Sequence, residues 1–191
     1  NDRGRLRETT AELGLAAYLG WWNGVTTADF DGDGRLDILA SNWGLNTEYR
    51  ATKESPCRLY YGDFDGSGTI NMVETSRDET SATEVPHRNL DTMAAALSYL
   101  RERFATHADY GRATVADLLG PVLSKARRVE AHTLASTLFL NRTNRFVAVP
   151  LPREAQFATA FGVCVGDFDG DGHEDVFLSQ NFFATQTKSP R

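Results

Sequence analysis

One acidic string occurs twice in this chain, and a third copy of it carries fewer charges. The strings are DFDGDGRLD at 29–37, DFDGSGTIN at 63–71 and DFDGDGHED at 167–175, which we call the first, second and third loops. Neighbouring carboxylates repel one another, so a run this crowded needs something to neutralise its charge. Short runs rich in Val, Ile, Tyr, Thr and Phe precede and follow each string, which predicts strand–loop–strand hairpins.

The spacing of the acids is that of a loop that wraps a hard cation. In D-x-D-x-D-G-x-x-D, positions 1, 3 and 5 place carboxylates on one side of a tight turn, and Gly at position 6 permits the reversal. Position 7 offers its backbone carbonyl and position 9 closes the shell. This oxygen set suits Ca²⁺, whereas Mg²⁺ prefers strict octahedral geometry and Zn²⁺ prefers His or Cys. A solvated Asp- and Gly-rich turn is the alternative, but four carboxylates in register, twice, favour calcium.

These positions name the predicted calcium ligands, with only the backbone carbonyl used at position 7. The first loop offers Asp29, Asp31, Asp33, the carbonyl of Arg35, and Asp37. The third loop offers Asp167, Asp169, Asp171, the carbonyl of His173, and Asp175. The second loop offers Asp63, Asp65, Ser67, the carbonyl of Thr69, and Asn71. We expect calcium in the first and third loops, and we treat the second as a third, weaker candidate.

Glu74 adds an open question to the second loop. It stands at position 12, with Gly68 at position 6, which completes an EF-hand pattern. If Asn71 to Glu74 turns helically, both side chains reach the ion, whereas in an extended segment they point to opposite faces. In the other two loops position 12 is Ala40 or Leu178, which cannot coordinate, so these are strand-flanked loops and not sensor EF-hands.

The rest of the chain predicts one partial, mainly β domain over 1–191 with a helical insertion. We assign β segments to about 1–46, 47–75 and 129–183, and helices to about 76–128. Leu90, Met93, Leu97 and Leu100 recur at helical spacing behind Asn89, a suitable N-cap. A second helix in YGRATVADLLGP should stop at its Gly-Pro pair, and VLSKARRVEAH extends it or begins a third. Four strands in two hairpins within 129–181 have the size of one propeller blade.

The loops and their flanks resemble a known repeat. ADFDGDGRLDILASNWG and VGDFDGDGHEDVFLSQN are similar to the FG-GAP/VCBS repeats of integrin-α-type β-propellers, and FGVCVGDFDGDG carries the Phe-Gly pair that opens such a repeat. The first copy has WWNGVTTADFDGDG instead, and the second retains only the loop. NTEYRATKESPCRLYYGDFDG and PLPREAQF are similar to bacterial VCBS-repeat proteins that carry an ASPIC/UnbV region.

The resemblance implies propeller-type blades, about three of them and not a closed seven-blade ring. The chain would then be a fragment whose sheet edges pair with the rest of a parent protein or with another chain. The resemblance also implies an extracytoplasmic place, secreted, periplasmic or at the cell surface, and a role in adhesion.

Charge and motifs narrow the function classes. The net charge of −6 argues against nucleic acid as a partner, and no apolar run approaches the length of a membrane span. Nucleophile elbow, P-loop and dinucleotide fingerprints are absent, so we predict no catalytic and no cofactor-binding residues. We expect a calcium-stabilised, non-enzymatic binding or scaffold module for a protein or glycan. The alternative is a calcium-dependent carbohydrate-active enzyme or an accessory carbohydrate-binding domain.

The tryptophans bear on glycan binding, and the cysteines bear on a possible disulfide. Trp21, Trp22 and Trp43 flank the first loop, where they either stack on sugars or pack in a core, and we favour packing. Cys57 and Cys164 could form one bridge, but Cys164 lies in an apolar run that predicts a buried free thiol.

Overall fold

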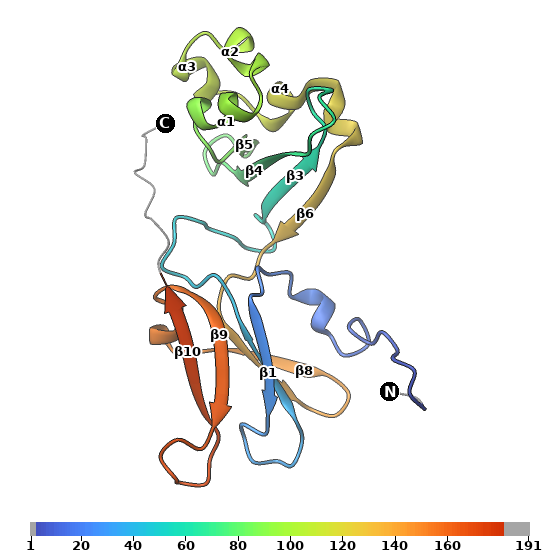
Figure 1. Ribbon diagram of the computed structural model, residues 1–191, viewed down its shortest axis with the longest axis vertical. Helices are drawn as coiled ribbons and strands as arrows, with labels where there is room; N and C mark the ends of the chain where they lie inside the picture. Colours follow the sequence, from blue (N-terminus) through green and yellow to red (C-terminus); the bar gives the residue numbers. More distant parts are fainter. Residues whose placement is uncertain (1–2, 182–191) are drawn as a thin grey trace. The chain divides into compact units, whose positions relative to one another are not determined.

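The computed structural model describes residues 3–181 and divides them into two compact units (Figure 1). Unit 1 consists of residues 3–48 and 133–181, and unit 2 consists of residues 49–132. Ten strands, all in antiparallel sheets, lie within the described residues, so the fold is mainly β as predicted. The outermost parts of the predicted domain, residues 1–2 and 182–191, lie outside the described residues.

Unit 1 contains a four-stranded sheet and a separate hairpin. The sheet has the order β1-β2-β7-β8, formed by β1 (Gly24–Ala28), β2 (Asp37–Ser41), β7 (Thr137–Asn141) and β8 (Phe146–Pro150). The hairpin pairs β9 (Thr159–Gly166) with β10 (Asp175–Asn181). The first loop joins β1 to β2, and the third joins β9 to β10. Short 3₁₀ turns occupy Leu15–Ala17 and Arg153–Gln156.

The prediction that residues 129–183 form one blade differs from the strand pairing of the structure. The β7–β8 hairpin pairs with β2, in the register Ile38↔Phe139 and Ala40↔Thr137, and not with the hairpin that follows it. This pairing buries Leu39 and Phe139, which are 0% and 4% exposed. Strand partners are therefore set by packing between distant segments, which a local sequence pattern does not contain.

Aromatic rings and buried amides hold the core of unit 1. Tyr18 and Trp22 meet the ring of Phe139 edge-on, with centroids 5.2 and 5.7 Å away. The buried side chain of Gln156 accepts from the Ser136 amide at 2.9 Å and donates to the carbonyls of Ser136 and Leu151. Buried polar groups are costly when unpaired, so this amide fixes the chain just before β7.

The hairpin β9–β10 packs closely against β1. A Cβ atom on Gly24 would lie 2.9 Å from the carbonyl oxygen of Phe161 and 3.0 Å from Ser41 Oγ, so only glycine fits at the start of β1. Figure 1 shows β1 and β9 pointing in the same direction. The first and third loops, which follow these strands, therefore lie at the same end of unit 1.

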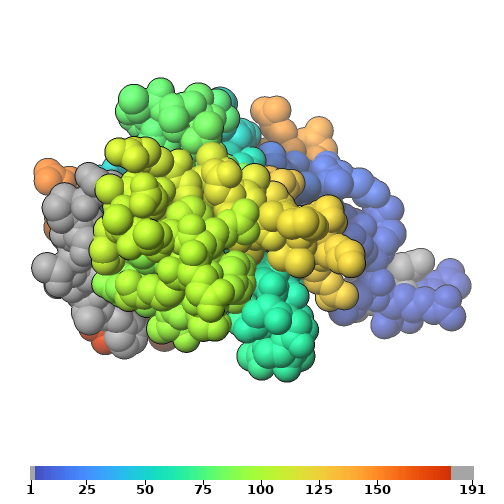
Figure 2. Space-filling view, turned by 90° about the horizontal axis from the view of Figure 1, so that it is seen from above, coloured from blue at the N-terminus to red at the C-terminus, as the bar shows by residue number. Residues whose placement is uncertain are grey.

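Unit 2 is a four-stranded sheet covered by short helices. The sheet has the order β5-β4-β3-β6, formed by β5 (Glu84–Pro86), β4 (Asn71–Arg77), β3 (Cys57–Gly62) and β6 (Arg127–Ala131). The helices are α1 (Leu90–Ala96), α2 (Tyr99–Arg103), α3 (His107–Gly111) and α4 (Val115–Leu119), and a 3₁₀ turn follows at Gly120–Lys125. Figure 2 shows the helical residues gathered on one face of this unit. No helix among the described residues is long and apolar enough to cross a bilayer.

The helical prediction for this region is confirmed in its packing face and wrong in its extent. Asn89 caps α1 by accepting from the amide of Thr92, and Leu90, Met93, Leu97 and Leu100 are all buried in the core of unit 2. The expected long helix is interrupted between α1 and α2, at 97–98.

The segment VLSKARRVEAH does not form a helix beyond its first residues. After the 3₁₀ turn it becomes β6, because Arg127–Ala131 pairs with β3 along the register Cys57↔Ala131 to Tyr61↔Arg127. The predicted insertion at 76–128 therefore contains β5 and the start of β6, and its strands complete the sheet of the second loop.

Candidate metal-binding loops

The three loops share one hydrogen-bond pattern. The side chain at position 9 accepts from the backbone amide at position 2 in each: Asp37 from Phe30 at 3.1 Å, Asn71 from Phe64 at 3.1 Å, and Asp175 from Phe168 at 3.0 Å. The carboxylate at position 1 accepts from the glycine amide at position 6: Asp29 from Gly34 at 2.8 Å, Asp63 from Gly68 at 2.9 Å, and Asp167 from Gly172 at 3.0 Å. The sequence repeat is thus also a structural repeat.

Glycine at position 6 is required by the backbone. Its φ angle is +82° in the first loop, +80° in the second and +86° in the third, in the left-handed region that other residues avoid. Position 5 then accepts from the amide at position 7, through Asp33, Ser67 or Asp171. The glycine amide at position 6 holds the position 1 carboxylate in the loop, where this carboxylate is also a predicted metal ligand.

The structure brings three carboxylates together in the first loop and three in the third. In each set, one oxygen per residue lies within 4.8 Å of the others: Asp29, Asp31 and Asp37, then Asp167, Asp169 and Asp175. Ca²⁺ binds oxygens at about 2.3–2.6 Å, so ligands of one ion lie up to about 5 Å apart, and both clusters fit such an ion. Asp33 and Asp171 are not in these clusters. The carbonyls of Arg35, Thr69 and His173 remain predicted ligands.

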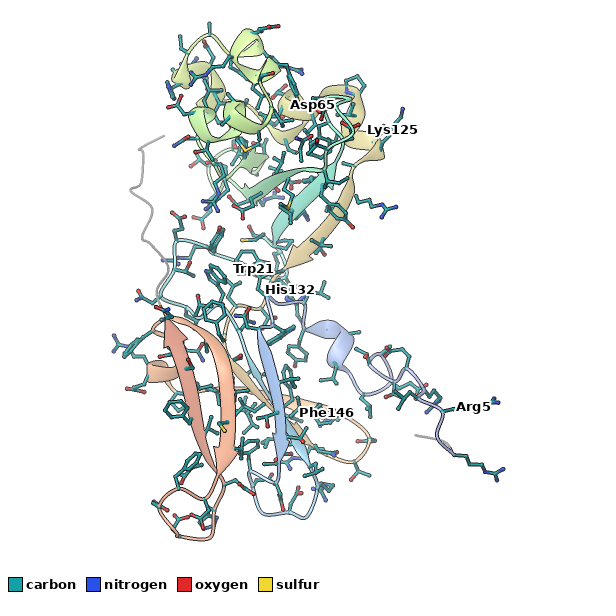
Figure 3. The ribbon with its side chains drawn as sticks, viewed as in Figure 1. Arg5, Trp21, Asp65, Lys125, His132 and Phe146 are labelled. Atoms are coloured by element: carbon teal, nitrogen blue, oxygen red, sulfur yellow. The ribbon has the colours of Figure 1, made fainter. Side chains whose placement is uncertain are left out.

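The second loop has the same backbone pattern with less charge. Asp65 lies at the turn between β3 and β4 (Figure 3). Hydrogen bonds from the Ser67 side chain and amide hold the pKa of Asp65 below its usual range. With Ser67 and Asn71 in place of acids, this loop offers two carboxylates, Asp63 and Asp65, and so a weaker attraction for a divalent ion.

Glu74 lies in an extended segment, the second of the two alternatives. It belongs to β4, and its position three residues after Asn71 places the two side chains on opposite faces of the strand. Its carboxylate accepts from Arg88 Nε at 2.7 Å and from the Tyr49 hydroxyl at 3.4 Å. The structure therefore places Glu74 in an ion pair of unit 2 and does not bring it to the second loop.

The first loop is tied to a distant turn, which sequence reasoning missed. Asp37 is fully buried, and its Oδ1 accepts from the amide of Asn141 at 2.7 Å. The Asn141 side chain donates to the carbonyl of Leu36 at 3.0 Å, and the Arg142 side chain reaches Asp31 and Asp33. The turn lies more than 100 residues after the first loop, and nothing in its sequence, NRTNR, indicates that it contacts that loop.

The tryptophans favour packing over sugar stacking. Trp21 meets Trp43 edge-on with centroids 5.4 Å apart, and Trp22 packs on Phe139. All three are partly buried. Both cysteines are free: Cys57 is buried, which raises the pKa of its thiol, and Cys164 is exposed, so its predicted burial is wrong.

Comparisons with known proteins leave the family open. A scan against protein-family models, a search of curated proteins and a search of solved structures each find no match for this chain.

Proposed function

We propose that the first and third loops bind Ca²⁺ and that the ions stabilise unit 1. The observation that carries this proposal is the pair of three-carboxylate clusters, built twice by one set of backbone hydrogen bonds. Oxygen donors at this number and spacing suit calcium better than magnesium or zinc. The second loop, with its shared pattern and two carboxylates, is proposed as a weaker third site.

We further propose that the chain is a non-enzymatic binding or scaffold module of the FG-GAP/VCBS propeller type, acting outside the cytoplasm on a protein or glycan. Calcium loops of extracellular modules bind with dissociation constants of about 10⁻⁴–10⁻³ M, which only millimolar calcium fills. Support comes from the strand-flanked loops and from the antiparallel sheets, while the ring contacts of Trp21, Trp22 and Trp43 favour packing over sugar stacking for these three residues.

Within the described residues, one edge of β10 is open, which supports the proposal that another strand pairs with it. The repeat places β10 in register with β2, so Phe177 corresponds to Leu39. Leu39 is fully buried, on a strand that pairs with both β1 and β7, whereas Phe177 is 62% exposed on a strand whose one partner among residues 3–181 is β9. We propose that another strand, from a parent protein or a second chain, covers β10.

Thermal unfolding tests the calcium proposal. Binding to the folded state adds RT ln(1 + [L]/Kd), so 10 mM calcium at a Kd of 10⁻⁴–10⁻³ M adds about 1.4–2.7 kcal/mol per site. We expect the melting temperature of unit 1 to rise by about 6–20 °C per occupied site relative to excess EDTA. Tryptophan fluorescence reports this unit, because Trp21, Trp22 and Trp43 all belong to it. Equal melting in calcium and EDTA would contradict the proposal, and an equal rise with magnesium would contradict the choice of ion.

A further inference from the structure

A guanidinium group lies against the carboxylates of the first loop. Arg142 belongs to the turn between β7 and β8, and its Nη1 lies 2.7 Å from Asp31 Oδ2 and 2.9 Å from Asp33 Oδ2. The hydrogen bond from Arg142 also holds the pKa of Asp31 below its usual range. The first loop thus already holds a positive charge that comes from the chain itself.

The turn that carries Arg142 is fixed in place by other contacts. The amide of Arg142 donates to the carbonyl of Arg145 at 2.8 Å, and the amide of Asn141 donates to Asp37. Arg35 Nε donates to the carbonyl of Asn141 at 3.0 Å, and the Arg35 guanidinium pairs with Asp33. Because the backbone is held at several points, only the rotamer freedom of the Arg142 side chain is lost when it reaches the loop.

The third loop offers the same carboxylates without such a partner in the described part of the chain. Within residues 3–181, no Lys, Arg or His side chain forms an ion pair with Asp167, Asp169, Asp171 or Asp175. The carboxylate clusters and the shared hydrogen bonds at positions 1 and 9 match between the two loops, whereas Asp37 alone also accepts from the amide of Asn141. Among residues 3–181, the first loop therefore has two built-in cations, Arg142 and Arg35, and the third loop has none, so the effect of Arg142 is isolated by replacing that residue alone.

We propose that Arg142 competes with calcium for the first loop and sets the affinity of that site below that of the third loop. This inference rests on the proposed calcium function. Asp31 belongs to the carboxylate cluster and is also the closest partner of Arg142, so one residue serves both cations. An ion that uses Asp31 must either displace the guanidinium or accept its positive charge nearby, and both lower the affinity.

The size of the effect follows from the exposure of the contacts. Ion pairs reached by solvent are individually weak, and Arg142 makes two of them, with its side chain 37% exposed. We expect the first loop to bind calcium about tenfold more weakly than the third, which corresponds to about 1.4 kcal/mol at 25 °C.

Calorimetric calcium titrations of the full chain test this ranking. Asp167→Asn with Asp169→Asn disables the third loop and leaves the first, and Asp29→Asn with Asp31→Asn does the reverse. Arg142→Gln is added to each background, and tryptophan fluorescence checks that every variant is folded. Arg145→Gln is the matched control, because it removes an exposed charge from the same turn that forms no ion pair among the described residues.

In the background that keeps the first loop, we expect Arg142→Gln to tighten calcium binding about tenfold and Arg145→Gln to change it less than about twofold. In the background that keeps the third loop, Arg142→Gln should change nothing. The inference is overturned if Arg142→Gln leaves the first loop unchanged or weaker. It is equally overturned, without any Arg142 variant, if the first loop binds as tightly as the third. Absence of binding in both backgrounds and in the unchanged chain would instead overturn the proposed calcium function.

Discussion

Replacing Asp37 with Asn should destabilise unit 1 by about 2–3 kcal/mol even in excess EDTA, where no ion contributes. Asp37 is fully buried, and each of its oxygens accepts one backbone amide, from Phe30 and from Asn141. Asn keeps the shape but has one acceptor oxygen, so its NH₂ group must face a buried N–H. A buried donor left unpaired costs about 1–3 kcal/mol, and hydrogen bonds to a charged acceptor are stronger than those to a neutral one. Urea unfolding followed by tryptophan fluorescence measures the loss.

The third loop provides the matched control. Asp175 occupies the same position, but it is only partly buried, and its one backbone hydrogen bond among residues 3–181 comes from Phe168. We expect Asp175→Asn to cost less than about 1 kcal/mol under the same conditions. Equal costs for the two variants, or a negligible cost for Asp37→Asn, would contradict the view that position 9 of the first loop joins the loop to the β7–β8 turn.

Replacing Leu97 with Ala should destabilise unit 2 by about 2–5 kcal/mol, the usual range for truncating a fully buried leucine. Leu97 is 0% exposed and lies between α1 and α2, in the core cluster with Leu100, Leu118 and Val73. The lost stability has two parts, the buried apolar surface that is removed and the cavity that remains. The short helices on the sheet can close this cavity only in part. Far-UV circular dichroism at 222 nm follows this unit, because all four described α-helices belong to it.

Met72→Ala serves as the control for this truncation. Met72 belongs to β4 of the same unit, and it is 62% exposed. Exposed substitutions away from special features change stability by about 0.5 kcal/mol or less. If Leu97→Ala unfolded with a midpoint like that of Met72→Ala, the helices would not share the core assigned to them.

Local sequence patterns predicted the helices and loops, because these features are set by residues close together in the chain. The stripe of Leu90, Met93 and Leu100 predicted both helicity and the buried face, and Asn89 predicted the cap. The D-x-D-x-D-G spacing predicted the loops between strands, since glycine at position 6 and the acceptors at positions 1 and 9 act within nine residues.

Contacts between distant segments could not be predicted from these local patterns. The sequence RRVEA is compatible with a helix, and it is a strand because the edge of β3 pairs with it. The partner of β2 is β7, chosen by the burial of Leu39 and Phe139. Arg142 reaches the first loop from 109 residues away, and a lone arginine in a polar turn carries no sign of its partner. The sequence allows two geometries for Glu74, and its placement follows from the extension of β4 and the ion pair with Arg88.

Direct counting of bound ions tests the central claim. Equilibrium dialysis of the full chain against calcium, with metal analysis of the protein compartment, should give about two ions per chain at 10 mM, since sites with Kd of about 10⁻⁴–10⁻³ M are then largely filled. Asp167→Asn with Asp169→Asn should remove one ion, and Asp29→Asn with Asp31→Asn should remove another. An unchanged count in both variants, or no bound calcium in the unchanged chain, would contradict the account.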